Sequence, residues 1–291
     1  MQDLAYKKGY REETALRKSF NELASQTFGI NFESWYQKGQ WTDKYIPYSY
    51  IVGDKVVGNV SVNKVDFIIN GEERRAIQIG TVMTDPSYRN QGLSRRLMEI
   101  VLEEYQSTYD FIYLFANQTV LEFYPKFGFE RMEESHFSFD VCGTHQEVPF
   151  RKLNPFIPKD FSLIEELVTE RVPLSKDFAT INTKELFMFY CLNVFDNDLY
   201  YWEEEEVLVI YQKENEELHL FDVVSKVKIN TNELLQKLAS TETKKVIFHF
   251  TPEGISVSKK KIISENDVLF VRKNRDFLLP KDFKHPITAK A

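Results

Sequence analysis

The sequence predicts an α+β protein of two domains, the first with a mixed sheet flanked by helices. Three observations lead to this prediction. Residues 12–28 carry apolar side chains at helical spacing, strand-like alternation begins at Tyr48, and prolines gather between residues 149 and 158. A chain of 291 residues has the length of two ordinary domains. We therefore expect domains at residues 1–148 and 149–291.

The elements of the first domain follow from periodicity and turn residues. A helix over residues 12–28 is predicted to end at Gly29, and a short helical or loop segment with Trp35, Tyr36 and Trp41 follows. Asn70-Gly71 indicates a two-residue hairpin, because both residue types tolerate positive φ. The remaining predicted elements are strands from Tyr48, at 56–69 and at 74–84, a helix from Leu93, a strand at 111–117, a short helix closed by Gly128 and a strand through HFSFDV.

The second domain is predicted to repeat the middle of the first. A helical region around residues 161–195 leads to strands at 206–213 and 217–224. A helix with Asn230 or Thr231 as N-cap and a strand at 244–250 follow. This order of two strands, helix and strand predicts an α/β domain that arose by duplication.

Composition excludes several function classes. The net charge of -7 argues against a nucleic-acid partner, because such proteins usually present a basic surplus. Cys142 and Cys191 lack the spacing of a zinc site or a disulfide framework, and neither a signal-type leader nor an 18-residue apolar run occurs. We expect a cytoplasmic protein without metal or membrane partner. The sequence leaves the oligomeric state open.

The stretch YRNQGLSRR, residues 88–96, predicts an anion site at the start of a helix. A helix N-terminus presents unpaired backbone N–H groups and a partial positive charge. Gly92 and the small Ser94 leave these groups accessible, and Arg89 adds a formal charge. The alternative is an ordinary loop-to-helix junction in which Gly92 only eases the turn.

The segment after this turn favours an anion site over an ordinary loop-to-helix junction. VMTDPSYRNQGLS, followed by Asn117, Val120, Tyr124 and Gly128 in NxxVxxxYxxxGF, resembles motifs A and B of the GCN5-related N-acetyltransferases (GNAT). The resemblance covers about half the chain and implies the acyl-CoA N-acyltransferase fold for the first domain. VVSKVKINTNELL in the second domain has no glycine between strand and helix, so that domain is expected to be a degenerate GNAT-like partner. The layout is similar to the enhanced-intracellular-survival type, without room for its third domain.

The resemblance also implies site residues. Val82, Met83 and Thr84 would offer backbone groups to the pantetheine amide and the thioester carbonyl, Asn117 would bond the pantetheine arm, and Tyr124 would stand next to the sulfur. Two positions depart from the family pattern, since Ser94 replaces Gly or Ala and Thr84 replaces a common Val. The implied pyrophosphate-binding residues are Arg89, Asn90, Gln91, Gly92, Leu93, Ser94 and Arg95.

The implied reaction is direct attack of a primary amine on acetyl coenzyme A in a ternary complex. The acceptor would be an amine of a small molecule or peptide, and Trp35 and Tyr36 would border its site unless they only pack against the sheet. The alternative is a non-catalytic acyl-CoA-binding sensor or interaction module.

The sequence identifies no general base. Gln78 stands where many relatives carry Glu and could at best position water. Asp43, Glu33 and His136 fit structural roles better. Ala291, the last residue of the sequence, gives no reason to expect its carboxylate in the site.

Overall fold

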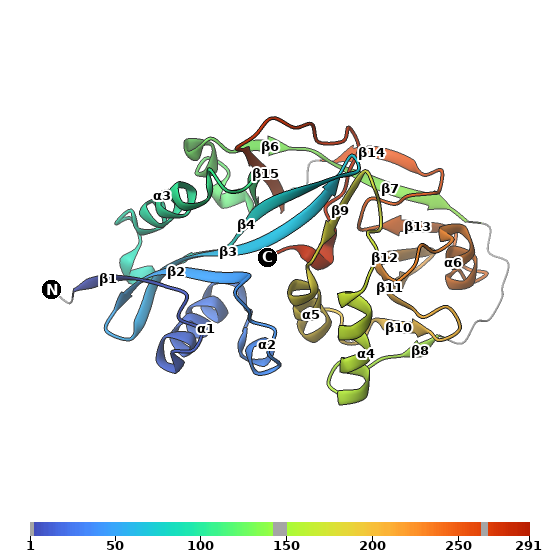
Figure 1. Cartoon of the computed structure of the whole chain (residues 1–291), viewed down its shortest axis with the longest axis horizontal. Helices are drawn as coiled ribbons and strands as arrows, with labels where there is room; N and C mark the ends of the chain where they lie inside the picture. The colour runs from blue at the N-terminus through green and yellow to red at the C-terminus, as the bar shows by residue number, and fades with distance from the viewer. Residues whose placement is uncertain (1–2, 142–149, 263–266) are drawn as a thin grey trace.

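The computed structural model describes residues 3–141, 150–262 and 267–291, which form two sheets with helices packed against them (Figure 1). The predicted domain boundary between residues 148 and 149 lies outside the described residues. The C-terminal end of the chain lies between the two sheets (Figure 1). Among the described helices, none combines the length and apolar character needed to cross a membrane.

The first sheet has the strand order β1-β2-β3-β4-β5-β15-β6, and β9 pairs with β3. Neighbouring strands are antiparallel except β4 and β5, which run parallel. The hairpin between β3 and β4 turns at Asn70 and Gly71, both at positive φ, as predicted. The strands are β1 (Leu4–Lys8), β2 (Tyr45–Val52), β3 (Lys55–Ile69), β4 (Glu72–Thr84), β5 (Phe111–Ala116), β6 (Glu130–Met132), β9 (Phe178–Ile181) and β15 (Val268–Lys273).

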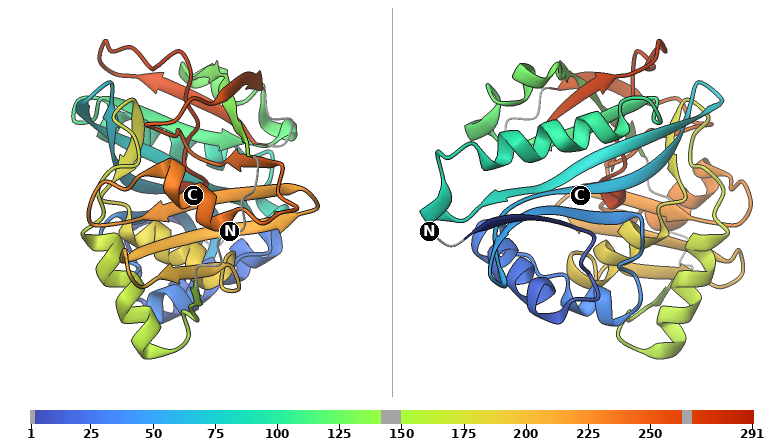
Figure 2. Two further views of the ribbon diagram at one scale, coloured as in Figure 1. Left: turned by 90° about the vertical axis from the view of Figure 1, so that its right-hand side faces the viewer. Right: turned by 60° about the vertical axis from the view of Figure 1, so that its left-hand side comes forward.

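Helices cover both faces of this sheet. On one face, α1 (Thr14–Phe28) and α2 (Glu33–Gln37) enclose an aromatic cluster that includes Phe20, Trp35 and Trp41. On the other face, α3 (Leu93–Tyr105) packs against β3 and β4 through residues such as Leu97 and Val101. Figure 2 shows α3 and α1 on opposite sides of the sheet. The α1 helix ends at Gly29 in a left-handed C-cap, as predicted.

The second sheet has the order β14-β7-β13-β12-β11-β10-β8. Its helices are α4 (Pro158–Thr169), α5 (Lys184–Asn193) and α6 (Thr231–Leu238), the last capped by the side chain of Asn230. The strands are β7 (Glu134–Asp140), β8 (Arg151–Lys152), β10 (Leu199–Trp202), β11 (Val207–Glu214), β12 (Glu217–Val224), β13 (Lys245–Phe248) and β14 (Ser258–Ile262).

The two sheets exchange strands. The strand predicted through HFSFDV is present as β7, but it pairs with β13 and β14 of the second sheet. Its expected place in the first sheet is taken by β15, which lies between β5 and β6 and is antiparallel to both. β15 fits there because Val268, Leu269, Phe270 and Val271 are all buried, so both of its faces meet core residues.

One other region differs from the prediction. The helical region expected around residues 161–195 consists of α4, β9 and α5, because Phe178–Ile181 pairs with the far end of β3. The charge run SKKKI is the fully exposed edge strand β14.

The unit β12-α6-β13 repeats β4-α3-β5. In each unit the two strands pair in parallel at four positions, ending at Ile79 with Leu114 and at Leu220 with Phe248. Each first strand then continues past a register shift, at Thr81 in β4 and at Phe221 in β12. The predicted repeat of strand, helix and strand is therefore present in three dimensions.

Candidate active site

The site begins where β4 and β5 separate. Beyond Ile79 and Leu114 the parallel pairing stops, and residues 80–84 line an opening toward the end of β5. Unpaired backbone groups at such an edge can bind an extended ligand as an added strand would. Ligands of open sheets commonly bind outside the carboxyl ends of parallel strands.

A β-bulge sets the direction of this open segment. The register shift of β4 against β3 leaves Thr81 at φ 43°, which is uncommon for a β-branched residue. Two buried side chains hold it. The amide of Asn59 donates to the Thr81 carbonyl at 2.8 Å, and the hydroxyls of Tyr45 and Thr81 lie 2.8 Å apart. The bulge therefore belongs to the folded core and gives the pocket wall a fixed shape.

The start of α3 forms the second wall. Asn90 and Gly92 both have positive φ, of 63° and 75°, so the turn contains two left-handed positions. Gly92 is the N-cap of α3, and no described side chain makes a capping hydrogen bond there. The first hydrogen bond of the helix runs from the Arg96 N–H to the Gly92 carbonyl. The N–H groups of residues 93–95 consequently have no partner within the helix.

These walls enclose a pocket of about 670 Å³, which is within the range of small-molecule and cofactor sites. Among the described lining residues, Arg89 alone has a charged side chain, and its guanidinium donates to the Thr84 carbonyl at 3.4 Å. Among the predicted site residues, those lining the pocket are Val82, Met83, Thr84, Arg89, Ser94, Asn117 and Tyr124. Asn90, Gln91, Gly92, Leu93 and Arg95 belong to the adjoining turn.

Ser94 and Thr84, the two departures from the family pattern, contact each other. The hydroxyls of Ser94 and Thr84 lie 2.8 Å apart and connect the start of α3 to the end of β4. Both departures thus belong to one local contact, which brings the two pocket walls together.

Tyr124 reaches the pocket from a turn. The predicted short helix consists of two 3-10 segments, Gln118–Val120 and Tyr124–Phe127, because Pro125 has no N–H to continue a helix. The Tyr124 ring packs against Phe129 and Phe270, and burial raises the pKa of its hydroxyl to about 12. No described residue bonds this hydroxyl. It is therefore a protonated donor facing the pocket at any physiological pH.

Asn117 follows the last residue of β5, and the oxygen of its side-chain amide is already hydrogen-bonded. Its side-chain oxygen accepts from the backbone N–H and the hydroxyl of Thr119, at 3.0 and 2.6 Å. The amide nitrogen has no partner among the described residues and can donate to a ligand.

Ala291 lies in this pocket, so the expectation that it stays outside is wrong. A Cβ at Gly80 would lie 3.1 Å from the carbonyl carbon of Ala291. Gln78, with its amide oriented to satisfy both bonds, donates to the Ala289 carbonyl at 3.1 Å and accepts from the Ala291 N–H at 2.9 Å. Gln78 is thus fully buried against the C-terminal segment instead of facing the pocket. Gly80, two residues after Gln78 on the same face of β4, leaves the room for this close approach.

The three side chains considered as general bases lie outside this pocket. Asp43 pairs with Arg11 at 2.7 Å, and Glu33 pairs with Arg17 at 3.0 Å. His136 belongs to β7 in the second sheet. Among the described residues, no carboxylate side chain lines the pocket.

Trp35 and Tyr36 do not line this pocket. The Trp35 indole is buried in the aromatic cluster and donates to the Glu185 carbonyl at 2.7 Å, while the Tyr36 hydroxyl donates to Glu12 at 2.9 Å. The residues at the end of α1 and just after it that do line the pocket are Thr27, Phe28 and Ile30.

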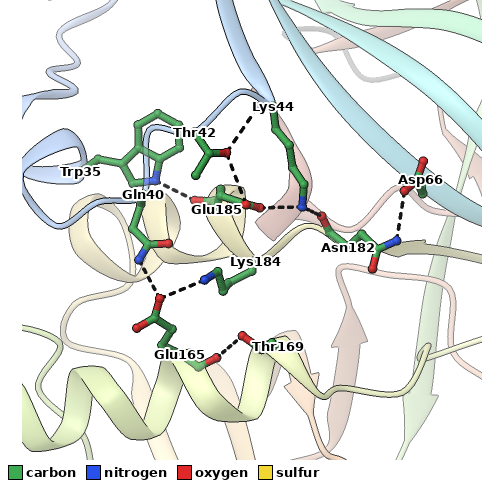
Figure 3. Close-up of polar contacts among 10 residues, drawn as sticks. All are labelled: Trp35, Gln40, Thr42, Lys44, Asp66, Glu165, Thr169, Asn182, Lys184 and Glu185. Carbon is green, nitrogen blue, oxygen red and sulfur yellow. Dashed lines mark hydrogen bonds and ion pairs between the residues drawn. The ribbon is translucent and has the colours of Figure 1, made fainter. Parts of the chain in front are cut away.

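Polar contacts join the α2 segment to the helices of the second sheet (Figure 3). Lys44 bonds the Glu185 carboxylate at 3.0 Å and the Asn182 carbonyl at 2.6 Å. Glu165 accepts from Gln40 and from Lys184, both at 3.0 Å. These contacts fix the segment that follows α1, whose end borders the pocket.

Comparison with known proteins agrees with this geometry. Residues 13–132 match the family model described as an acetyltransferase (GNAT) domain. A search of curated proteins found no match.

Several solved structures share the fold over 94% of this chain. A protein of unknown function from Enterococcus faecalis V583, described as a probable N-acyltransferase, aligns with a TM-score of 0.61, 16% identity and 73% of its own chain covered. A GCN5-related N-acetyltransferase from Kribbella flavida aligns with a TM-score of 0.59, 17% identity and 72% covered. Eis1 from Mycobacterium abscessus gives 0.58, 12% and 73%. At these identities the likeness concerns the fold, and it extends across both sheets.

The separated strands, the uncapped helix start and the family match concern the same part of the chain. Residues 13–132 are therefore a domain of the GCN5-related N-acetyltransferase family.

Proposed function

We propose that the protein is an N-acetyltransferase that transfers the acetyl group of acetyl coenzyme A to a primary amine of a small molecule or peptide. The observation that supports this most strongly is the pocket between β4 and β5, where Arg89, Asn117 and Tyr124 meet the open start of α3. An acyl-CoA thioester needs a site for a diphosphate, a polar edge for the pantetheine amides and a donor near the sulfur. The pocket offers each of these.

The diphosphate would bind at the unpaired N–H groups of residues 93–95, beside the guanidinium of Arg89. Positive φ at Asn90 and Gly92 turns the chain here without placing a Cβ over the turn at Gly92. The pantetheine arm would follow residues 82–84 of β4, with Asn117 donating from the opposite side. A backbone N–H at this edge would also stabilise the oxyanion that forms as the amine attacks.

Tyr124 would act as a hydrogen-bond donor to the leaving sulfur. A coenzyme A thiol of ordinary pKa near 8.5 facing a phenol of pKa about 12 makes full proton transfer uphill by about 5 kcal/mol. A hydrogen bond that strengthens as charge develops on sulfur avoids this cost. Tyr124 therefore stabilises the thiolate without losing its proton.

The amine must lose its proton before it attacks. A lysine-like amine of pKa about 10.4 is neutral in roughly one of 2,500 molecules at pH 7, equivalent to about 4.6 kcal/mol. Because no described carboxylate side chain lines the pocket, we propose that solvent takes this proton.

The test is to incubate the purified chain with acetyl coenzyme A and a panel of amines and to follow the release of free thiol. Tyr124→Phe should keep the affinity for coenzyme A and lower the maximal rate by about tenfold or more, as expected when a general acid or donor is lost. Phe123→Leu, at a neighbouring pocket residue, is the control for packing. An unchanged rate in Tyr124→Phe would remove Tyr124 from the mechanism.

The absence of a carboxylate side chain from the described pocket lining also favours a second candidate, a non-catalytic acyl-CoA-binding sensor. Saturable binding of acetyl coenzyme A without thiol release on any amine would support it over the first. In either case we expect the protein in the cytoplasm, which fractionation of cells expressing it would check.

A further inference from the structure

A second cavity, of about 560 Å³, lies in the repeated unit and shares no lining residue with the first. It opens beyond the point where β12 and β13 separate, next to the start of α6. Its position in β12-α6-β13 thus corresponds to that of the acetyltransferase pocket in β4-α3-β5. The β3-β4 hairpin closes one side, where the Gly71 N–H donates to the Lys176 carbonyl at 2.8 Å.

The lining of this cavity is apolar inside and cationic at the mouth. Leu220, Leu234 and Phe250 are almost completely buried, at 0%, 1% and 4% exposure. Two lysines, Lys176 and Lys228, are exposed at the rim. A ligand with a hydrocarbon body and a polar end would match this gradient.

The charged side chains at the mouth of the cavity favour a ligand that carries a single negative charge. Glu253 pairs with Lys228 at 2.7 Å and accepts from the backbone N–H of Lys176 at 2.6 Å. The Lys176 ammonium has no hydrogen-bonding side-chain partner among the described residues, so the mouth carries one net positive charge.

A diphosphate does not fit here. The side chain of Asn230 already caps α6, and no described residue between 221 and 231 has positive φ to form an anion-binding turn. Glu253 would repel a multiply charged group at the same place. The cavity is therefore not a second coenzyme A site.

We propose that this cavity binds a small apolar monocarboxylate. The hydrocarbon part lies among Leu220, Leu234 and Phe250, and the carboxylate lies at Lys176. This site is independent of the proposed acetyl transfer, since the two cavities are lined by different residues.

Calorimetry on the full chain with decanoate, below its micelle concentration, tests the proposal. One saturable site per chain is expected, with decylamine binding at least about fivefold more weakly because its charge is reversed. Val223→Trp, which fills the cavity, and Ile229→Trp, at a half-buried lining position, should each weaken decanoate binding at least about tenfold. Lys176→Gln, at an exposed position where folding is not at risk, should weaken it about two- to fivefold.

Circular dichroism and thermal melts establish that each variant is folded. The proposal is overturned if decanoate does not bind more tightly than about 1 mM. It is also overturned if decylamine binds equally well, if the folded variants retain full affinity, or if coenzyme A competes with decanoate. Competition would place the ligand in the acetyltransferase pocket instead.

Discussion

Gly92 provides the sharpest test of the proposed coenzyme A site. Its φ of 75° lies in the left-handed region, where an L-residue with a Cβ costs about 1 to 2 kcal/mol. A Cβ at residue 92 would meet no described atom within 4 Å, apart from its chain neighbours. Gly92→Ala should therefore cost about 1 kcal/mol of stability without any clash in the free protein.

The effect on ligand binding should be larger than the effect on stability. The new methyl would project from the turn whose N–H groups are proposed to hold the diphosphate. Losing one charge-assisted hydrogen bond, worth about 1.5 to 3 kcal/mol, weakens coenzyme A binding about 10- to 150-fold.

Gly39 supplies a matched control. It has φ 73°, also has no described atom within 4 Å of an added Cβ, and does not line the pocket. Gly39→Ala should lower the melting temperature about as much as Gly92→Ala, by about 2 to 4 °C. Calorimetry with coenzyme A should distinguish the two variants. Equal affinity in both would refute the assignment of the α3 turn as the diphosphate site.

Three further predictions concern pH, the buried ion pair and the C-terminal segment. With a lysine-like acceptor, kcat/KM should rise up to about tenfold per pH unit from pH 7 to 9, because the neutral amine becomes more abundant while Tyr124, with a pKa of about 12, stays protonated; a decline over this range in a pH-rate profile would contradict this. Asp222→Ala should destabilise the fold by about 3 to 5 kcal/mol in denaturant titrations, because it leaves the Arg171 guanidinium unpaired in a buried site, whereas Asp43→Ala, at a 91% exposed side chain, should change little. Gly80→Val should displace Ala291, and an unmoved Ala291 in a crystal structure of the variant would speak against the contact.

The parts of the fold that neighbouring residues determine could be predicted from the sequence. Asn70 and Gly71 adopt positive φ because the tight turn requires it, and Gly29 and Gly128 end their segments in left-handed caps. The pattern around Gly92 likewise identified the turn of the candidate site.

Features that depend on distant partners could not be predicted. The apolar run at β15 is compatible with a strand, but nothing in it says that it pairs with β5, more than 150 residues earlier. The same holds for Ala291, whose place in the pocket results from contacts with Gln78 and Gly80. The spacing of Val120 and Tyr124 predicted a helix before Gly128, but the segment forms 3-10 turns because Pro125 has no N–H to continue a helix.

The insertion of β15 between β5 and β6 has a consequence for biosynthesis. A nascent chain that has just completed β7 still exposes the ladder groups along one side of β5, which is a hazard for aggregation. About 130 more residues must leave the ribosome before β15 can cover this side, which takes about 6 to 25 s at ordinary rates of translation. The first sheet is therefore completed only after β15 has been synthesised, and chaperones that bind exposed strands have time to act on the chain before then.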